Sequence, residues 1–337
     1  EVEKSRGHWI NPALAKQTFG DFTSDWLTTQ VHLAPTTHQK VRGHLENHLV
    51  PAFGRMRLAS IQPSHVRFWI AKISESERSP ATVISVASTL RRVMNSAVND
   101  GVLGRSPCDG ASLPRLDPAR PKVVLTPSQI IRLADCIHPR YRALIYLAAY
   151  GGLRWGELAA LHPKRLDLKR GSVDVRESLA DVSGTLITLT PKSKKRRSVS
   201  LPPFLCDILG EHLELFSSEE YVFTSSAAKP LRRSNWYRRD FKPAVISSGV
   251  DPSLWFHHLR STCVALAVAE GAHPKTVQER LGHGSIRITL DTYGELFPSL
   301  DERLRDDLDR AHIEALAASA RPEDENLIPF EPTKTEE

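Results

Sequence analysis

Hydrophobic residues recur three and four positions apart through residues 18–106, a spacing that places side chains on one face of an α-helix. The segments that follow this spacing contain Phe22 and Trp26, then Val41, Leu45 and Leu49, then Val86, Leu90, Val93 and Ala97. Prolines and polar turn residues separate four or five such segments. The pattern therefore predicts a wholly helical domain over residues 18–106.

The periodicity changes in the second part of the chain. Helical spacing over 127–137 and 140–150 is followed by three segments of alternating polar and apolar residues, 172–177, 185–191 and 196–202. Alternation of this kind predicts short strands, and we expect the segment KSKK at the tip of a hairpin between the last two. Helical spacing resumes at 203–213, 234–247, 258–270, 274–281, 285–295 and 302–319. The predicted fold class is therefore mainly α with a small β-sheet (α+β).

Composition divides the chain into domains. Four prolines in residues 107–122 predict an extended linker between the helical domain and a mixed domain over residues 123–300. An amphipathic helix over 301–320 and an acidic tail over 321–337, which we expect to be disordered, complete the chain. Residues 1–17 have the composition of a connector.

The overall composition is that of an ordinary globular protein, with 40% hydrophobic and 25% charged residues in a chain of 337. The most apolar segment, Ala143 to Leu153, is too short to cross a bilayer. The N-terminal segment lacks the apolar core of a signal peptide. Four cysteines stand far apart without a C-x-x-C pair, which favours reduced thiols in the cytoplasm. We therefore expect no membrane partner.

Positive charge is concentrated in two segments of a chain whose net charge is +6. KSKKRR (192–197) places five cations in six residues, and RRSNWYRR (232–239) combines four arginines with two aromatic residues. Such clusters are typical of nucleic-acid contacts, although a solvated surface or a localisation signal has the same composition. The residues predicted to contact DNA are Lys194, Lys195, Arg196, Arg197, Arg232, Arg233, Arg238 and Arg239.

Two motifs contain arginines suited to binding a phosphate. In YGGLRWGEL, a glycine break allows a helix to begin beside Arg154, and Glu157 lies three residues later on the same face. A plain surface ion pair is the alternative for this motif alone. In WFHHLRST, His257 and Arg260 share a helix face, so that an imidazole and a guanidinium point in the same direction. A histidine that serves only in helix packing is the alternative there.

Two further segments supply groups for chemistry. Lys192 lies in the basic segment, where a lysine can donate a proton to a leaving oxygen. LGHGSIRITLDTYGEL places His283 before a short helix that is capped by Ser285 and ends near Tyr293. With the arginines, these groups can stabilise a pentacoordinate phosphorane while the tyrosine attacks, and neither a metal nor a cofactor is needed. A tyrosine that only fills an interfacial core position is the alternative.

One histidine pair resembles a metal motif only superficially. HLENH places His44 and His48 four residues apart, but the segment is not H-E-x-x-H and offers no third ligand nearby. We interpret it as a helix face directed toward DNA or solvent.

The order of the motifs resembles the tyrosine recombinases, the phage integrase family, over about residues 18–300. The resemblance implies that Arg154 and Arg260 clamp the scissile phosphate and that Tyr293 is the nucleophile. It implies further that His257 and His283 are the two site histidines, that Lys192 is the general acid and that Glu157 is the supporting acid. Lys194 and Lys195 remain alternatives to Lys192. His258 and Ser261 depart from the commoner His-Asp-Leu-Arg-His pattern at positions that do not usually bind the phosphate.

The resemblance implies a site-specific DNA recombinase that acts through a 3′-phosphotyrosyl bond and a Holliday junction held by four protomers. Double-stranded DNA core sites are the expected partners, and a host DNA-bending factor and a directionality factor are further candidates. The expected location is the cytoplasm of a bacterial host, at the nucleoid. An Xer-like resolvase or a transposon recombinase is the alternative within the same chemistry, and a non-catalytic DNA-binding accessory protein is the alternative from another class. Integrases of this type often carry an arm-binding module, which we expect ahead of the 1–17 connector.

Overall fold

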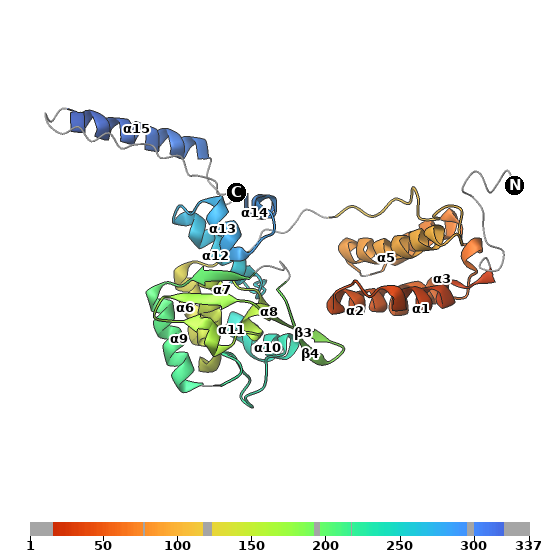
Figure 1. The fold of residues 1–337 in the computed structure, drawn as a ribbon, viewed down its shortest axis with the longest axis horizontal. Coiled ribbons are helices and arrows are strands. Elements are labelled where there is room, and N and C mark those ends of the chain that lie inside the picture. The colour runs from red at the N-terminus through yellow and green to blue at the C-terminus, as the bar shows by residue number, and fades with distance from the viewer. Residues whose placement is uncertain are drawn as a thin grey trace, which may run out of the picture.

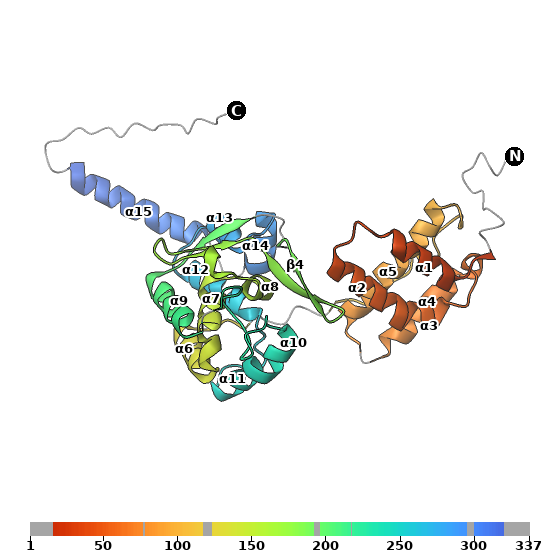
Figure 2. The same ribbon diagram turned by 60° about the horizontal axis from the view of Figure 1, so that its bottom comes forward.

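The computed structural model describes residues 16–76, 78–116, 123–191, 196–216, 218–294 and 300–319, with side chains from 305 onward in the last segment. Two lobes lie side by side, and a long helix, α15 (Leu300–Ser319), projects from one of them (Figures 1 and 2). The predicted arm-module connector and the tail over 321–337 fall almost entirely outside the described residues. None of the helices in the described ranges is both long and apolar enough to cross a membrane.

The N-terminal lobe consists of short helices around one core. Its helices are α1 (Phe19–Thr29), α2 (Pro35–His44), α3 (Val50–Phe53), α4 (Pro63–Ser74) and α5 (Pro80–Asn99), with a π-helical turn at Leu45–Leu49 and a 3₁₀ turn at Leu58–Ser60. Prolines stand at the starts of α2, α4 and α5, where a missing N–H costs nothing. The rings of Phe19, Phe53 and Trp69 pack against one another in the core.

The second lobe is built around α7 (Arg142–Gly151), whose side chains are buried on nearly every side. A helix that is apolar all round must be covered by other elements. Helices α6 (Pro127–Cys136), α9 (Pro203–Leu215) and α12 (His258–Ala269) pack against it. This arrangement explains the apolar segment beginning at Ala143: it is the central helix of a globular core.

The remaining elements of this lobe surround that centre. The helices are α8 (Trp155–Ala159), α10 (Arg233–Trp236), α11 (Lys242–Ser247), α13 (Pro274–Leu281) and α14 (Ile286–Tyr293), with 3₁₀ turns at Pro139–Tyr141 and Pro163–Arg165 and a π-helical turn at Tyr237–Phe241. The strands are β1 (Leu166–Asp167), β2 (Ser172–Val175), β3 (Ser178–Val182), β4 (Thr185–Leu189) and β5 (Arg197–Ser200). The predicted fold class, mainly helical with small antiparallel sheets, is confirmed.

The strand pairing differs from the sequence prediction. We expected the segments 185–191 and 196–202 to form one hairpin, but β4 pairs with β3, and β5 pairs with β2 in a separate three-stranded sheet. The β3–β4 turn has positive φ at both Ser183 and Gly184, and the Asp181 carboxylate accepts a hydrogen bond from the Gly184 N–H. Two left-handed residues form the tight turn that strand twist favours, and this turn pairs β4 with the strand before it.

The β3–β4 hairpin reaches the N-terminal lobe. It projects from the second lobe toward α2 in both views (Figures 1 and 2), and α2 contacts β3. The Gln39 side-chain amide lies 3.4 Å from the Ser183 hydroxyl, to which it donates. The hairpin therefore forms one wall of the space between the lobes.

The end of α7 gives a test of the core packing. Gly152 has a φ of 68°, and a Cβ there would lie 3.0 Å from both Cys263 Sγ and Leu281 Cδ2. Gly249 has a φ of 66° with no atom near the position of its missing Cβ. Gly152→Ala should therefore lower the free energy of unfolding by roughly 2–4 kcal/mol through strain and overpacking, and Gly249→Ala by only about 1 kcal/mol. Urea unfolding measures both, and equal losses would contradict the packing described.

Candidate active site

Arg154 stands at the start of α8, directly after the break that ends α7. Its backbone N–H donates to Glu157 Oε2 at 2.8 Å, and its guanidinium donates to Glu157 Oε1 at 3.1 Å. The Glu157 side chain is 1% exposed, whereas that of Arg154 is 25% exposed and lines a cavity of about 720 Å³. The carboxylate thus holds Arg154 from the protein side and leaves part of its guanidinium facing the cavity.

Arg260 is the largest fully buried side chain among the described residues. Its guanidinium donates to the carbonyl oxygens of Gly152 and of Leu281, the latter at 2.6 Å. Arg154 donates to the same Leu281 oxygen at 3.5 Å, so the structure brings the two predicted phosphate-binding arginines together. Burial and the charge of Arg154 lower the pKa of Arg260, but a guanidinium remains protonated at neutral pH.

The two predicted site histidines are neutral in this surrounding. Burial lowers the pKa of His283 to about 4, followed by the charges of Arg260, Arg154 and Arg197. The same causes lower the pKa of His257 to about 4, with desolvation first and the charges of Arg260 and Arg154 next. His257 nevertheless lines the cavity and is exposed. Each imidazole can therefore offer one N–H donor to a phosphate without adding charge.

Tyr293 ends helix α14 with its side chain only 4% exposed. Its ring lies parallel to that of His283 at a centroid distance of 6.3 Å, and it belongs to a small core formed by α12, α13 and α14. His283 is fixed in turn by a hydrogen bond of 2.9 Å between Nδ1 and the Thr289 hydroxyl. The structure thus brings His283 and Tyr293 together on one short helical unit.

The basic segment is placed only in part. Lys192, Lys194 and Lys195 lie outside the described residues, so the assignment of the general acid stays a prediction. Arg196 is exposed and directly precedes β5.

Arg197 differs from the sequence expectation of a DNA contact. Its side chain is 7% exposed and donates to both oxygens of Glu157, at 3.0 and 2.8 Å. The signal was present in the sequence, because strand alternation places Arg197 on the same face as the buried Val199. Because Arg197 also ends the basic segment 192–197, the alternation was not recognised as a sign of burial.

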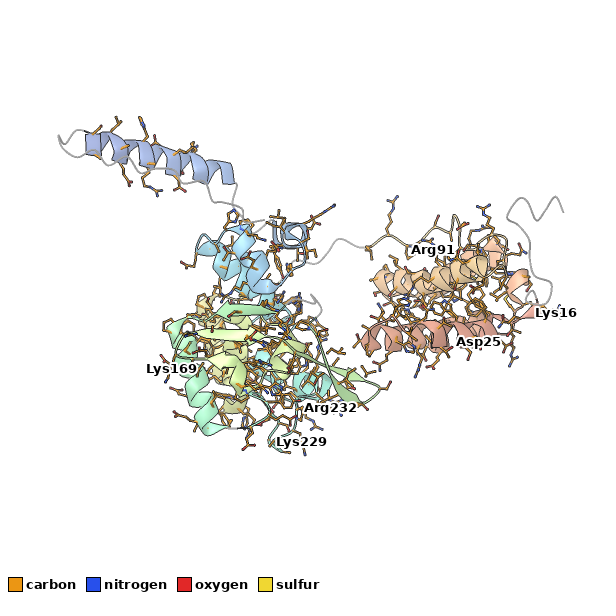
Figure 3. The ribbon with its side chains drawn as sticks, viewed as in Figure 1. Lys16, Asp25, Arg91, Lys169, Lys229 and Arg232 are labelled. Atoms are coloured by element: carbon orange, nitrogen blue, oxygen red, sulfur yellow. The ribbon has the colours of Figure 1, made fainter. Side chains whose placement is uncertain are left out.

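The arginines of the second basic segment (232–239) also differ in their exposure and in what they contact. Arg233, Arg238 and Arg239 are exposed, and Arg233 lines the same cavity as Arg154. Arg232, labelled in Figure 3, instead pairs with Asp181 at 2.6 Å and donates to the Gly184 carbonyl at 2.8 Å. Arg232 therefore holds the β3–β4 turn, which is a structural role that its position in a basic cluster did not indicate.

The cavity between the lobes is lined by nitrogen donors. Three cationic or neutral nitrogen donors, Arg154, Arg233 and His257, line the cavity between the lobes, which suits a phosphate. Within the described ranges, no group of three or more His, Cys, Asp or Glu residues is arranged to hold a metal ion.

Comparison with known proteins accounts for this arrangement. The model of the phage integrase family matches residues 123–299, and the model of the phage integrase N-terminal SAM-like domain matches residues 18–74. The chain belongs to the phage integrase family. The predicted resemblance to tyrosine recombinases is thereby confirmed, and with it a site-specific recombinase that breaks and rejoins DNA.

Individual relatives have low sequence identity to this chain, but the similarity extends over most of each protein. The chain is 26% identical to the ICEBs1 integrase of Bacillus subtilis, across 83% of this chain and 79% of that protein. It is 27% identical to the integrase of Mycobacterium phage L5, across 81% of this chain and 74% of that one. The fold resembles that of the Tn1549 transposon integrase in complex with transposon right end DNA, with a TM-score of 0.72 and 19% identity across 87% and 99% of the two chains.

The depressed pKa of His283 predicts sensitivity to acid. The folded integrase has a pKa of about 4 at this residue, against an ordinary 6.5 when unfolded. Between these values the unfolded state binds more protons, so the free energy of unfolding should fall as pH is lowered from 6.5 to 4. His283→Gln should reduce proton uptake on unfolding in this window by up to about one proton. Denaturant titrations at several pH values measure this slope, and an unchanged slope in the variant would contradict a neutral His283.

Proposed function

We propose that Tyr293 of this integrase attacks the scissile phosphate of a duplex core site while Arg154 and Arg260 hold that phosphate. The observation that carries the proposal is the convergence of residues from α8, α12 and the α13–α14 turn. Arg154 and Arg260 share the Leu281 carbonyl, and the next residues of the chain lead to His283, whose ring is stacked with Tyr293. Residues separated by more than a hundred positions thus meet around one backbone oxygen.

The proposed reaction is a transesterification. The Tyr293 oxygen forms a bond to phosphorus and releases its proton to solvent, and the bond from phosphorus to the 5′-oxygen breaks. The departing 5′-oxygen takes a proton from Lys192 or a neighbouring lysine and becomes a hydroxyl. The guanidinium groups and neutral imidazoles stabilise the charge that develops on the phosphate oxygens. The 3′-phosphotyrosyl bond retains the energy of the broken ester, so rejoining needs no ATP.

Exposed cations support a DNA clamp formed by the helical domain (18–106) and the mixed domain (123–300). In the mixed domain, Arg196, Arg233, Arg238 and Arg239 are candidates for phosphate contacts. In the helical domain, Lys40, His44, His48, Arg78 and Arg92 gather where α2 and its π-helical extension pack beside α5. Lys40, Arg78 and Arg92, the charged members of this group, form no ion pair with a carboxylate of the described residues, which favours phosphate as their counterion. Burial lowers the pKa of His44 to about 4 and, with the charge of Arg78, lowers that of His48, so the two imidazoles contribute neutral hydrogen-bonding groups.

Assembly and cellular context extend the proposal. Four protomers would hold a Holliday junction, with a host DNA-bending factor and a directionality factor as accessory partners at the nucleoid of a bacterial cell. Resolution of dimers or movement of a transposon would use the same chemistry. Recovery and sequencing of both recombined junctions would distinguish integration from these alternatives.

Removal of the Tyr293 hydroxyl tests the nucleophile. Tyr293→Phe should abolish covalent attachment to a duplex that spans the junction between the encoding genetic element and its chromosome. DNA affinity should stay within about threefold, because many phosphate contacts determine it. Denaturing gels measure the adduct, and mobility shifts measure affinity. A denaturant-stable adduct formed by the variant would exclude Tyr293 as the nucleophile.

The C-terminal helix gives a second test. Leu308, Ile313 and Leu316 on the projecting α15 are more than half exposed, which favours packing on a neighbouring protomer over packing in cis. Deletion of residues 301–337 should weaken pairing of two DNA sites at least tenfold while binding to one site changes little. Native gels with one and two labelled duplexes separate these events. Equal losses of both would indicate packing in cis.

A further inference from the structure

Arg197 lies beneath the proposed phosphate site without lining its cavity. Its side chain is less exposed than that of Arg154, 7% against 25%, and only Arg154 is among the cavity residues. The two arginines share one carboxylate: each oxygen of Glu157 accepts one hydrogen bond from Arg154 and one from Arg197. Arg197 therefore affects the site through the groups that it holds.

A third hydrogen-bond donor of Arg197 contacts a different element of the fold, α13. Arg197 Nε donates to the Arg280 carbonyl at 2.9 Å, at the end of α13. The following carbonyl, of Leu281, is the one that accepts from both Arg260 and Arg154. One guanidinium thus fixes Glu157 on α8 and the turn over residues 280–283, which leads to His283.

The backbone of that turn fits closely around Arg197. Gly282 has a φ of 64°, and a Cβ at this residue would lie 2.9 Å from Arg197 Cδ and 3.2 Å from one guanidinium nitrogen. A side chain at residue 282 would push against the arginine as well as strain the backbone. The turn and the guanidinium are therefore packed as one unit.

We propose that Arg197 is a positioning residue that locks Glu157 and the 280–283 turn together, so that Arg154, Arg260 and His283 are aligned on the phosphate. This inference rests on the proposed function of the site. In this role Arg197 connects β5, which follows the segment containing Lys192, to the turn that leads to His283.

The electrostatics of Glu157 provide a specific signature. Burial alone would raise the pKa of Glu157, but hydrogen bonds and charge from Arg197, followed by those from Arg154, lower it overall. Loss of Arg197 should raise this pKa, because a buried carboxylate loses two charged donors. Other charged groups around Glu157 are Arg260 on α12 and, across a small cavity, Arg165, Asp174, Arg176 and Glu177.

The test compares full-length variants on the element–chromosome junction duplex. Arg197→Met should slow adduct formation at saturating DNA by about tenfold to a hundredfold, because small misplacements of aligned groups have effects of that size. The rate of adduct formation by Arg197→Met should also gain an acid limb, which is a fall in rate on the acid side of the pH profile. This fall should begin at a higher pH than in the wild type, because Glu157 becomes protonated there. DNA affinity should change less than about threefold, since the side chain is buried.

Two further variants make the result decisive. Arg170→Met removes an exposed arginine from the turn between β1 and β2, and should leave rate and affinity unchanged. Among the described residues its guanidinium pairs only with Asp167. Arg197→Lys keeps the charge but loses the two-pronged contact, and should give a rate between those of wild type and Arg197→Met. If Arg197→Met does not fold, the rate of adduct formation by Arg197→Lys tests the inference on its own.

Three outcomes would overturn the inference. A wild-type rate at saturating DNA in Arg197→Lys, or in a folded Arg197→Met, shows that Arg197 does not position the site. Weaker DNA binding with an unchanged rate assigns Arg197 to a phosphate contact. A slower rate without the acid limb shows that Arg197 does not act through Glu157. Failure of wild type and Arg170→Met to form any adduct would instead contradict the proposed function itself.

Discussion

The carboxylate of Glu157 is almost completely excluded from water, and a buried charge is tolerated only when it is paired and hydrogen-bonded. Here two arginines and one backbone N–H provide the compensation, so that both oxygens are satisfied. Because one arginine comes from the same short helix and the other from a strand forty residues later, the charge requirement fixes the relative position of α8 and β5. The orientation of Arg154 toward the cavity follows from this arrangement.

The other arginines of the site are held by helix ends. The carbonyl oxygens of the last residues of a helix lack intrahelical donors and carry partial negative charge. Arg260 donates to Gly152 at the end of α7 and to Leu281 at the end of α13, while Arg280 donates to the Tyr150 carbonyl at 2.6 Å. Two helix C-termini thus act as ligands for guanidinium groups, which lets cations gather in the interior without a carboxylate for each.

Burial, together with this concentration of positive charge, keeps the pKa of both histidines low. A protonated imidazole beside several arginines would be both desolvated and repelled, so His257 and His283 remain neutral. In the proposed mechanism the arginines supply the charge that complements a phosphate, and the imidazoles supply directional hydrogen bonds. Their separation into these two roles follows from burial first and from the nearby arginines second.

Local signals in the sequence determined the helical first domain, the mixed second domain and the identity of most site candidates. Periodicity and turn residues act over a few positions, and motif order restricts the chemistry, so these features can be read without a structure. Alternation indicates a strand but not its partner, and the left-handed turn at Ser183 and Gly184 is what pairs β4 with β3.

Only the tertiary structure separated the arginines by role. In the sequence, Arg196 and Arg197 are adjacent cations with the same chemistry, yet one is exposed and the other is bound to Glu157 and the Arg280 carbonyl. Arg232 similarly belongs to a basic cluster but stabilises a hairpin turn. The sequence by itself determined which residues carry charge. Which of those charges reach a phosphate and which support the protein depends on burial and on partners distant in the chain, and these are properties of the folded packing.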